Sequence, residues 1–117
     1  MILTGLLLAA GAAVAVGVAA IFWDDLRDWL VEGLNFLMQT IKGIVHGVKV
    51  FVKKVYKTYQ QISKTYYQDE KKKWHETIKT REISENEVPE EIRVKAQANN
   101  REYDVTSQFE NVLEMTH

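Results

Sequence analysis

Polar side chains recur at every third or fourth position between residues 32 and 49 of this chain. On a helix, that spacing places them on one face. Several copies of such a helix around an axis would line the axis with rings of polar and charged groups, which is how pores select ions. The alternative is a coiled-coil helix that assembles without conducting ions. The sequence therefore predicts a homo-oligomeric pore whose lining residues would be Glu32, Asn35, Gln39, Lys42, His46 and Lys49.

A cluster of cationic and aromatic side chains follows, and its members suit an anionic ligand. Lysine ammonium groups attract phosphates, while tyrosine rings offer stacking surfaces for the bases of single-stranded nucleic acid. The same lysines could instead attract anionic lipid headgroups or pair with the acidic C-terminal tail. We expect an anionic ligand, for which a single-stranded DNA oligomer is one candidate, to contact Lys53, Lys54, Tyr56, Lys57 and Tyr59.

The sequence contains no residues with the spacing of an active site or a metal site. None of His46, His75 and His117 has a metal-ligand spacing to another histidine, and the chain has no cysteine. Gly-rich phosphate loops and nucleophile elbows are also missing from the sequence. We therefore predict no enzymatic activity, no metal and no cofactor.

The elements that would position these residues begin with an uncharged N-terminal segment. Residues 1–23 hold no charged side chain, and about 22 residues at ~1.5 Å rise would span the ~30 Å of bilayer hydrocarbon. We predict a transmembrane helix that ends at Trp23, where an interfacial tryptophan belongs. Small residues at every fourth position from Gly5 to Gly17 indicate close packing against another helix. A cleaved signal peptide is the competing interpretation.

A long amphipathic helix is expected over residues 24–67. Its apolar positions from Leu30 to Ile62 are spaced mostly by four and three in alternation, the heptad rhythm of packed helices. The polar face of residues 30–52 is so narrow that it predicts a second membrane span, or else a helix in a bundle or in the membrane interface. With one span or two, the lysines that follow place the C-terminal region in the cytoplasm, at the inner membrane.

Charge divides the rest of the chain into a basic and an acidic part. Residues 49–81 hold ten Lys/Arg against three Asp/Glu, whereas residues 82–117 hold three against nine. We predict a basic helical extension over residues 68–81 and an acidic, helical C-terminal cap over residues 82–117. Within the cap, Ser84 and Ser107 each precede a glutamate by three residues, the capping-box pattern that begins a helix.

Together these segments predict an all-α membrane protein that forms a symmetric homo-oligomer. The apolar residues 1–23, the polar stripe from Glu32 to Lys53 and the lysine- and tyrosine-rich stretch from Lys53 to Tyr67 resemble the small membrane channel effectors of bacterial antiphage defence, in particular the Hailong-type effector. The resemblance covers the architecture of the whole chain and includes no diagnostic motif. It implies an oligomeric ion channel that a single-stranded DNA oligomer holds closed, and membrane depolarisation when that oligomer is lost.

Two further functions fit the same segments. A non-conducting, membrane-anchored coiled-coil scaffold or adaptor would recruit a partner to the inner face of the membrane. A holin-like lysis protein would be lethal without any ligand. The sequence alone leaves these alternatives open beside the channel.

Overall fold

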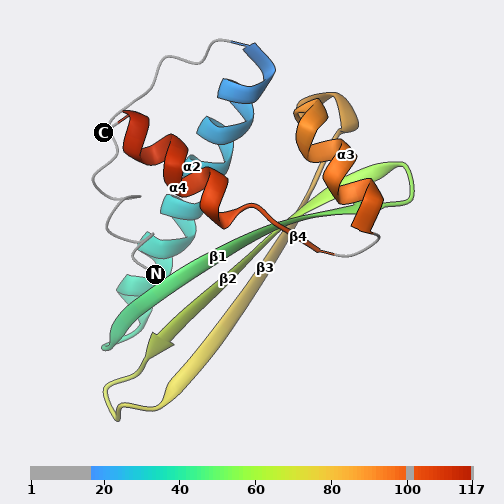
Figure 1. Cartoon of the computed structure of the whole chain (residues 1–117). Helices are drawn as coiled ribbons and strands as arrows, with labels where there is room; N and C mark the ends of the chain where they lie inside the picture. Colours follow the sequence, from blue (N-terminus) through green and yellow to red (C-terminus); the bar gives the residue numbers. More distant parts are fainter. Residues whose placement is uncertain (1–16, 100–101, 117) are drawn as a thin grey trace.

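A four-stranded antiparallel sheet carries the helices of this protein on one of its faces (Figure 1). The computed structural model describes residues 17–99 and 102–116. Helix α2 (Gly17–Thr40) leads into strands β1 (Ile44–Val55), β2 (Thr58–Gln68) and β3 (Trp74–Ile83). A 3-10 turn (Glu85–Glu87), helix α3 (Glu90–Asn99), strand β4 (Tyr103–Asp104) and helix α4 (Thr106–Thr116) follow. The order of the strands across the sheet is β3-β2-β1-β4.

Strand β1 forms because β-branched residues occupy every second position. Val48, Val50 and Val52 are fully buried beneath the helices, and such residues favour a pleated strand with one buried face. β1 pairs with β2 along its whole length except for a bulge at His46, where Val45 and Gly47 face consecutive residues of β2.

Two tight turns connect the three long strands. Only Tyr56 and Lys57 join β1 to β2, and Tyr56 adopts a left-handed backbone with φ 56°. Residues 69–73 join β2 to β3, where the Asp69 carboxylate accepts hydrogen bonds from the backbone N–H groups of Lys71 and Lys73 at 2.8 and 3.0 Å. An aspartate that binds backbone donors two and four residues ahead stabilises such a turn.

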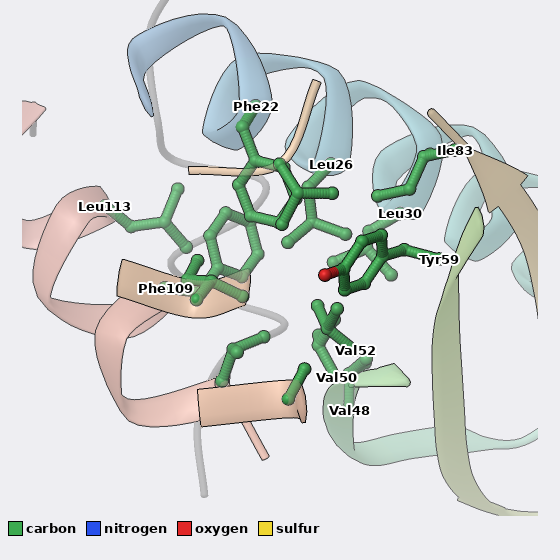
Figure 2. Packing of buried hydrophobic residues seen from close by; sticks show 14 of the residues in the cluster. Phe22, Leu26, Leu30, Val48, Val50, Val52, Tyr59, Ile83, Phe109 and Leu113 are labelled. Atoms are coloured by element: carbon green, nitrogen blue, oxygen red, sulfur yellow. The ribbon is translucent and has the colours of Figure 1, made fainter. Parts of the chain in front are cut away.

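The hydrophobic core lies between the sheet and the helices (Figure 2). Helix α2 contributes apolar residues at every fourth position, which places them on one face. Helix α4 contributes Phe109 and Leu113, helix α3 contributes Ile92 and Ala96, and the ring of Tyr59 enters from β2. The α2 residues that fill the core are Phe22, Leu26, Leu30 and Leu34.

The start of α4 completes the edge of the sheet beside β1. The backbone N–H of Val50 donates to Thr106 Oγ1 at 2.9 Å, and the N–H of Val105 donates to the carbonyl of Val50 at 3.0 Å. Since β4 pairs only at Phe51 and Val52, these two bonds satisfy buried backbone groups that no neighbouring strand of the described chain reaches.

The predicted all-α fold is wrong, because the chain has an α+β fold. Residues 24–67, expected as one helix, contain most of α2 and then two strands, and the expected basic helical extension at 68–81 contains most of β3. The same stretch also carries valines at alternate positions of β1, namely Val48, Val50 and Val52, of which the helical spacing by threes and fours includes only Val48. Pairing between strands therefore overrode the helical pattern.

The prediction of a membrane protein is also contradicted. In the described part of the chain, no helix combines the length and the apolar character that a membrane crossing needs. Residues 1–16 of the expected first span lie outside the described residues, and residues 17–23 begin α2, whose next residues include Asp24, Asp25, Arg27 and Asp28. Trp23 does not act as an interfacial anchor here, since its ring stacks on Phe109 with centroids 5.9 Å apart.

The two helices expected within residues 82–117 are confirmed. Helix α3 begins just after Pro89 and buries Ile92 and Ala96, and α4 buries Phe109 and Leu113. The predicted capping boxes do not coincide with the starts of these helices. Ser84 precedes the 3-10 turn and forms no side-chain cap bond, and α4 begins one residue before Ser107, where Asp104 Oδ1 accepts the N–H of Thr106.

Candidate functional site

The face of the sheet beneath the helices has two chemically different halves. The β1 half carries valines, as expected for a core. The half formed by β2 and β3 carries polar side chains, although β2 there is as buried as β1. Buried polar side chains are more informative about function than buried apolar ones. In the strand register, the polar half is formed by Gln61, Ser63 and Thr65 opposite Arg81, Lys79 and Thr77.

Helix α2 covers this polar half with aromatic side chains. The Arg81 guanidinium lies 4.8 Å from the ring centroid of Trp29, and the Lys79 ammonium lies 5.4 Å from that of Phe36. Gly33 lies between Trp29 and Phe36 in sequence, and a Cβ added at Gly33 would come 3.6 Å from Lys79 Nζ. The absence of a side chain at this position therefore keeps space open between α2 and β3.

A cleft runs between α2 and the polar half of the sheet. Its enclosed part has a volume of about 90 Å³, and an adjoining open part of about 360 Å³ shares Trp29, Gly33, Phe36 and Lys79 with it. Ligand sites of this kind are mostly apolar with a few polar groups that fix orientation. The enclosed part is lined by Trp29, Leu30, Gly33, Leu34, Phe36, Leu37, Ser63, Thr65, Thr77 and Lys79.

Two hydroxyl groups on the floor of the cleft have no partner among the described residues. Ser63 is 5% exposed and Thr65 is 9% exposed, yet neither hydroxyl forms a hydrogen bond within residues 17–99 and 102–116. Neither hydroxyl is among the buried side-chain atoms that lack a partner in the described chain, and both residues line the cleft, so the hydroxyls reach its open space. These hydroxyls are therefore available to a molecule in the cleft.

The two cations of the site play different parts. Arg81 donates from Nε to the Gln61 side-chain oxygen, and burial lowers the pKa of its guanidinium from so high a value that the charge is kept. Lys79 is exposed and forms no ion pair with any described residue. Arg81 thus belongs to the structure of the floor, whereas Lys79 offers an ammonium group at the mouth.

No family model, curated protein or solved structure matches this chain. Its function is therefore inferred from the geometry of the site. Across residues 17–99 and 102–116, no three histidine, aspartate or glutamate side chains gather closely enough to hold a metal ion.

The six residues predicted to line a pore are all exposed and do not share one element. The first three, including Glu32, lie on α2; Lys42 lies in the connection to β1; and His46 and Lys49 lie on β1. Their spacing of three and four therefore produces no continuous stripe. Of the six, Glu32 borders the open part of the cleft, next to Lys79.

The five residues predicted to bind an anionic ligand gather around the β1–β2 turn, with one exception. Tyr56 is 86% exposed at the tip, and the Lys57 ammonium lies 5.8 Å from its ring centroid. Lys53 and Lys54 precede the turn on opposite faces of β1. Tyr59 is fully buried, so its ring belongs to the core and offers no surface to a ligand.

A second polar cluster orders the opposite end of the sheet. His75 Nε2 lies 2.8 Å from Asp69 Oδ2, and the His75 ring stacks on Tyr67. These bonds, with the backbone donors of the turn, hold the pKa of Asp69 below its usual range. His46 lies 2.8 Å from the Gln68 amide oxygen. The side chains of this cluster are bound to one another, so we assign the cluster to the structure of the turn.

The residues of the cleft were not predicted from the sequence, although a signal was present. Ser63, Thr65, Thr77 and Lys79 follow the two-residue alternation of strands, with small polar side chains on the buried face. Such an alternation becomes visible only when residues 58–83 are treated as a hairpin.

Proposed function

We propose that this protein binds a small amphipathic anion, such as a fatty acid or an aromatic carboxylate, in the cleft between α2 and the sheet. The observation that carries the proposal is an apolar cleft whose floor holds the hydroxyl groups of Ser63 and Thr65, which form no hydrogen bond with any described residue. Lys79 supplies a cation at the mouth of the same cleft.

The chemistry of the lining selects the ligand. Leu30, Leu34 and Leu37 with the two aromatic rings favour an apolar body. The carboxylate would accept charge-assisted hydrogen bonds from Lys79, and such bonds contribute about 1.5–3 kcal/mol. A second polar atom further along the ligand would reach the hydroxyl groups of Ser63 and Thr65.

Titration with octanoate tests this proposal. We expect octanoate to bind the full chain, to raise its melting temperature and to change the tryptophan emission, since Trp29 lines the cleft. Octanol has a similar apolar body but no charge. It should bind at least roughly tenfold more weakly than octanoate, because it gains no ion pair with Lys79.

A matched pair of variants decides whether the cleft is the site. Lys79→Met should weaken octanoate binding roughly tenfold or more. Lys49→Met makes the same change at an exposed lysine on the opposite face of the sheet and should leave binding unchanged. Equal affinity of both variants for octanoate, or no binding by a series of aliphatic and aromatic carboxylates, would refute the proposal.

A second candidate function is favoured by the basic turn between β1 and β2. Lys53, Lys54 and Lys57 form no ion pair within the described residues, and Tyr56 projects beside them. Free ammonium groups next to an exposed aromatic ring suit single-stranded nucleic acid. We infer that a single-stranded DNA oligomer, if it is a partner of this protein, binds at this turn.

Fluorescence anisotropy with a labelled thymidine oligomer tests this second function. The triple variant Lys53→Gln, Lys54→Gln, Lys57→Gln should lose binding and flatten its salt dependence. Lys71→Gln, Lys72→Gln, Lys73→Gln removes the same charge at the other end of the sheet and should bind nearly as the native chain does. If both triple variants lose the oligomer equally, binding is a matter of net charge and the turn is not the site.

Ion conduction and ligand gating, as the resemblance implied them, stay predictions. The helical stripe that suggested a pore is divided between α2 and β1. The two proposed functions therefore share an anionic ligand and include no pore.

A further inference from the structure

We propose that the ligand of the cleft is a phenolic carboxylic acid, which places its hydroxyl group in the enclosed part of the cleft and its carboxylate at the mouth. This ligand class rests on the proposed function and refines it, since both concern the same cleft. Three hydroxyl groups in the enclosed part carry the proposal, those of Ser63, Thr65 and Thr77.

These hydroxyl groups favour a polar atom at the buried end of the ligand. All three residues line the enclosed part of the cleft, and none of them lines the open part. Their hydroxyl groups form no hydrogen bond with any described residue. Polar groups that reach an open cavity bind water, and a ligand that displaces this water without replacing its hydrogen bonds loses affinity. An acid with a purely apolar body therefore binds at a disadvantage.

The strand register places the hydroxyl groups at two levels along the sheet. Ser63 lies opposite Lys79, and Thr65 lies opposite Thr77. The two levels are two residues apart, which is ~7 Å along antiparallel strands. Side chains that face each other on neighbouring strands have Cβ atoms ~5 Å apart. A single hydroxyl group of the ligand between the two threonines can therefore donate to one of them and accept from the other.

The cation of the cleft lies at the level of Ser63. Lys79 borders both the enclosed and the open part of the cleft, and its ammonium group lies 5.4 Å from the ring centroid of Phe36. The cleft is thus polar at two separate levels and apolar between α2 and the sheet. A ligand with a polar atom at each end matches both levels, whereas a fatty acid matches only one.

The space between these polar groups suits one aromatic ring. Gly33 places no side chain over the cleft, and the rings of Trp29 and Phe36 line it, so a ring of the ligand can pack against them. An apolar cavity of about 150 Å³ holds benzene, and the enclosed 90 Å³ of this cleft opens into a larger space. A ring also loses less conformational freedom on binding than a flexible alkyl chain does.

Two acids that differ in one group test the proposal on the native chain. The acids are para-hydroxyphenylpropanoate and para-methylphenylpropanoate, which share a carboxylate and have nearly the same shape. We expect calorimetric titration to show roughly tenfold tighter binding of the phenolic acid, the value of about one hydrogen bond. Equal affinities would overturn the phenolic ligand and leave the proposed function intact. No binding of either acid or of octanoate would overturn both.

A double variant tests where the hydroxyl group of the ligand binds. Thr65→Val combined with Thr77→Val should remove the preference for the phenolic acid. Thr80→Val is the matched control, because Thr80 is exposed on the opposite face of β3, and it should keep the preference. Each variant is judged by the ratio of its two affinities, so a general loss of affinity does not imitate the effect. A preference that survives in the double variant would overturn the proposal.

Discussion

The phenol of Tyr59 accepts a hydrogen bond from Nε2 of Gln97 at 2.8 Å, and this bond joins strand β2 to helix α3. The Tyr59 ring is fully buried, and the Lys54 ammonium lies 5.5 Å from its centroid. A residue expected at a ligand surface is thus a structural link between the sheet and a helix. Figure 2 shows its ring beside the α2 and β1 side chains of the core.

Tyr59→Phe should therefore lower the free energy of unfolding by about 1 kcal/mol, the net value of one hydrogen bond. The ring stays in the core, and the exposed Gln97 amide can turn to water. Urea unfolding measures the change. A double-mutant cycle with Gln97→Ala provides the control, because Gln97→Ala should cost nothing further once the phenol is gone.

Thr106→Val should be more destabilising, by about 1–3 kcal/mol, because it leaves the buried N–H of Val50 without an acceptor. Thr106→Ser keeps the hydroxyl and removes one methyl group, so it should cost about 0.8 kcal/mol or less. Thermal unfolding of the two variants distinguishes these effects. A larger loss in Thr106→Ser than in Thr106→Val would mean that the methyl group and not the hydrogen bond stabilises this edge.

Two glycines should respond to alanine in opposite directions. A Cβ at Gly43 would collide with the Gln68 carbonyl oxygen and come 2.8 Å from Asp69 Cα, so Gly43→Ala must displace backbone. Gly33 lies inside α2 and has only the flexible end of Lys79 nearby, so Gly33→Ala should stabilise the fold by up to about 1 kcal/mol.

Melting temperatures of both variants check this prediction. A stable Gly43→Ala protein would show that the connection between α2 and β1 can move. Gly33→Ala should also narrow the cleft, so octanoate should bind it more weakly than the native chain even though the fold is more stable.

Because the pKa of Asp69 is lowered, its carboxylate should stabilise the folded state, and this stabilisation should be lost in acid. His75 is its largest cause, followed by the backbone N–H of Lys73. Because the pKa is lower in the folded state, the contribution is fully present above the unfolded value of about 3.9 and disappears as the pH falls through the folded value. Asp69→Asn should therefore reduce stability near neutral pH and flatten its decline in acid.

Melting curves between about pH 2 and pH 6 follow this effect, and the Asp69 carboxyl carbon resonance reports its titration directly. Glu70→Gln is a suitable control, since Glu70 is exposed and lies in the same turn. A decline in acid that is equally steep in the native chain and in Asp69→Asn would contradict the assignment.

Local patterns in the sequence were sufficient for the C-terminal helices. The stripe of Ile92 and Ala96 and the pair Phe109 and Leu113 lie within single short helices, where residues three and four apart share a face. Pro89 marks the beginning of α3 for a similarly local reason, because its fixed φ suits the start of a helix.

The middle of the chain obeyed two patterns at once, and only tertiary structure decided between them. Val48 fits the heptad spacing from Leu34 to Ile62 and also the alternation of Val48, Val50 and Val52. A strand becomes stable only when its backbone groups find partners, and those partners lie far along the chain, as Tyr59 lies opposite Ile83. The periodicity of residues 44–68 therefore does not predict that pairing.

The sequence by itself determined the separation of basic from acidic segments, the two C-terminal helices and the apolar positions Leu30 and Leu34 on one face of α2. The tertiary structure decided that Ser63 and Thr65 lie beside Lys79 beneath Trp29, because β2 pairs with β3 and α2 covers both. A site built from several segments depends on contacts between residues distant in sequence. No local spacing can express such contacts, since each segment is stabilised only by the others.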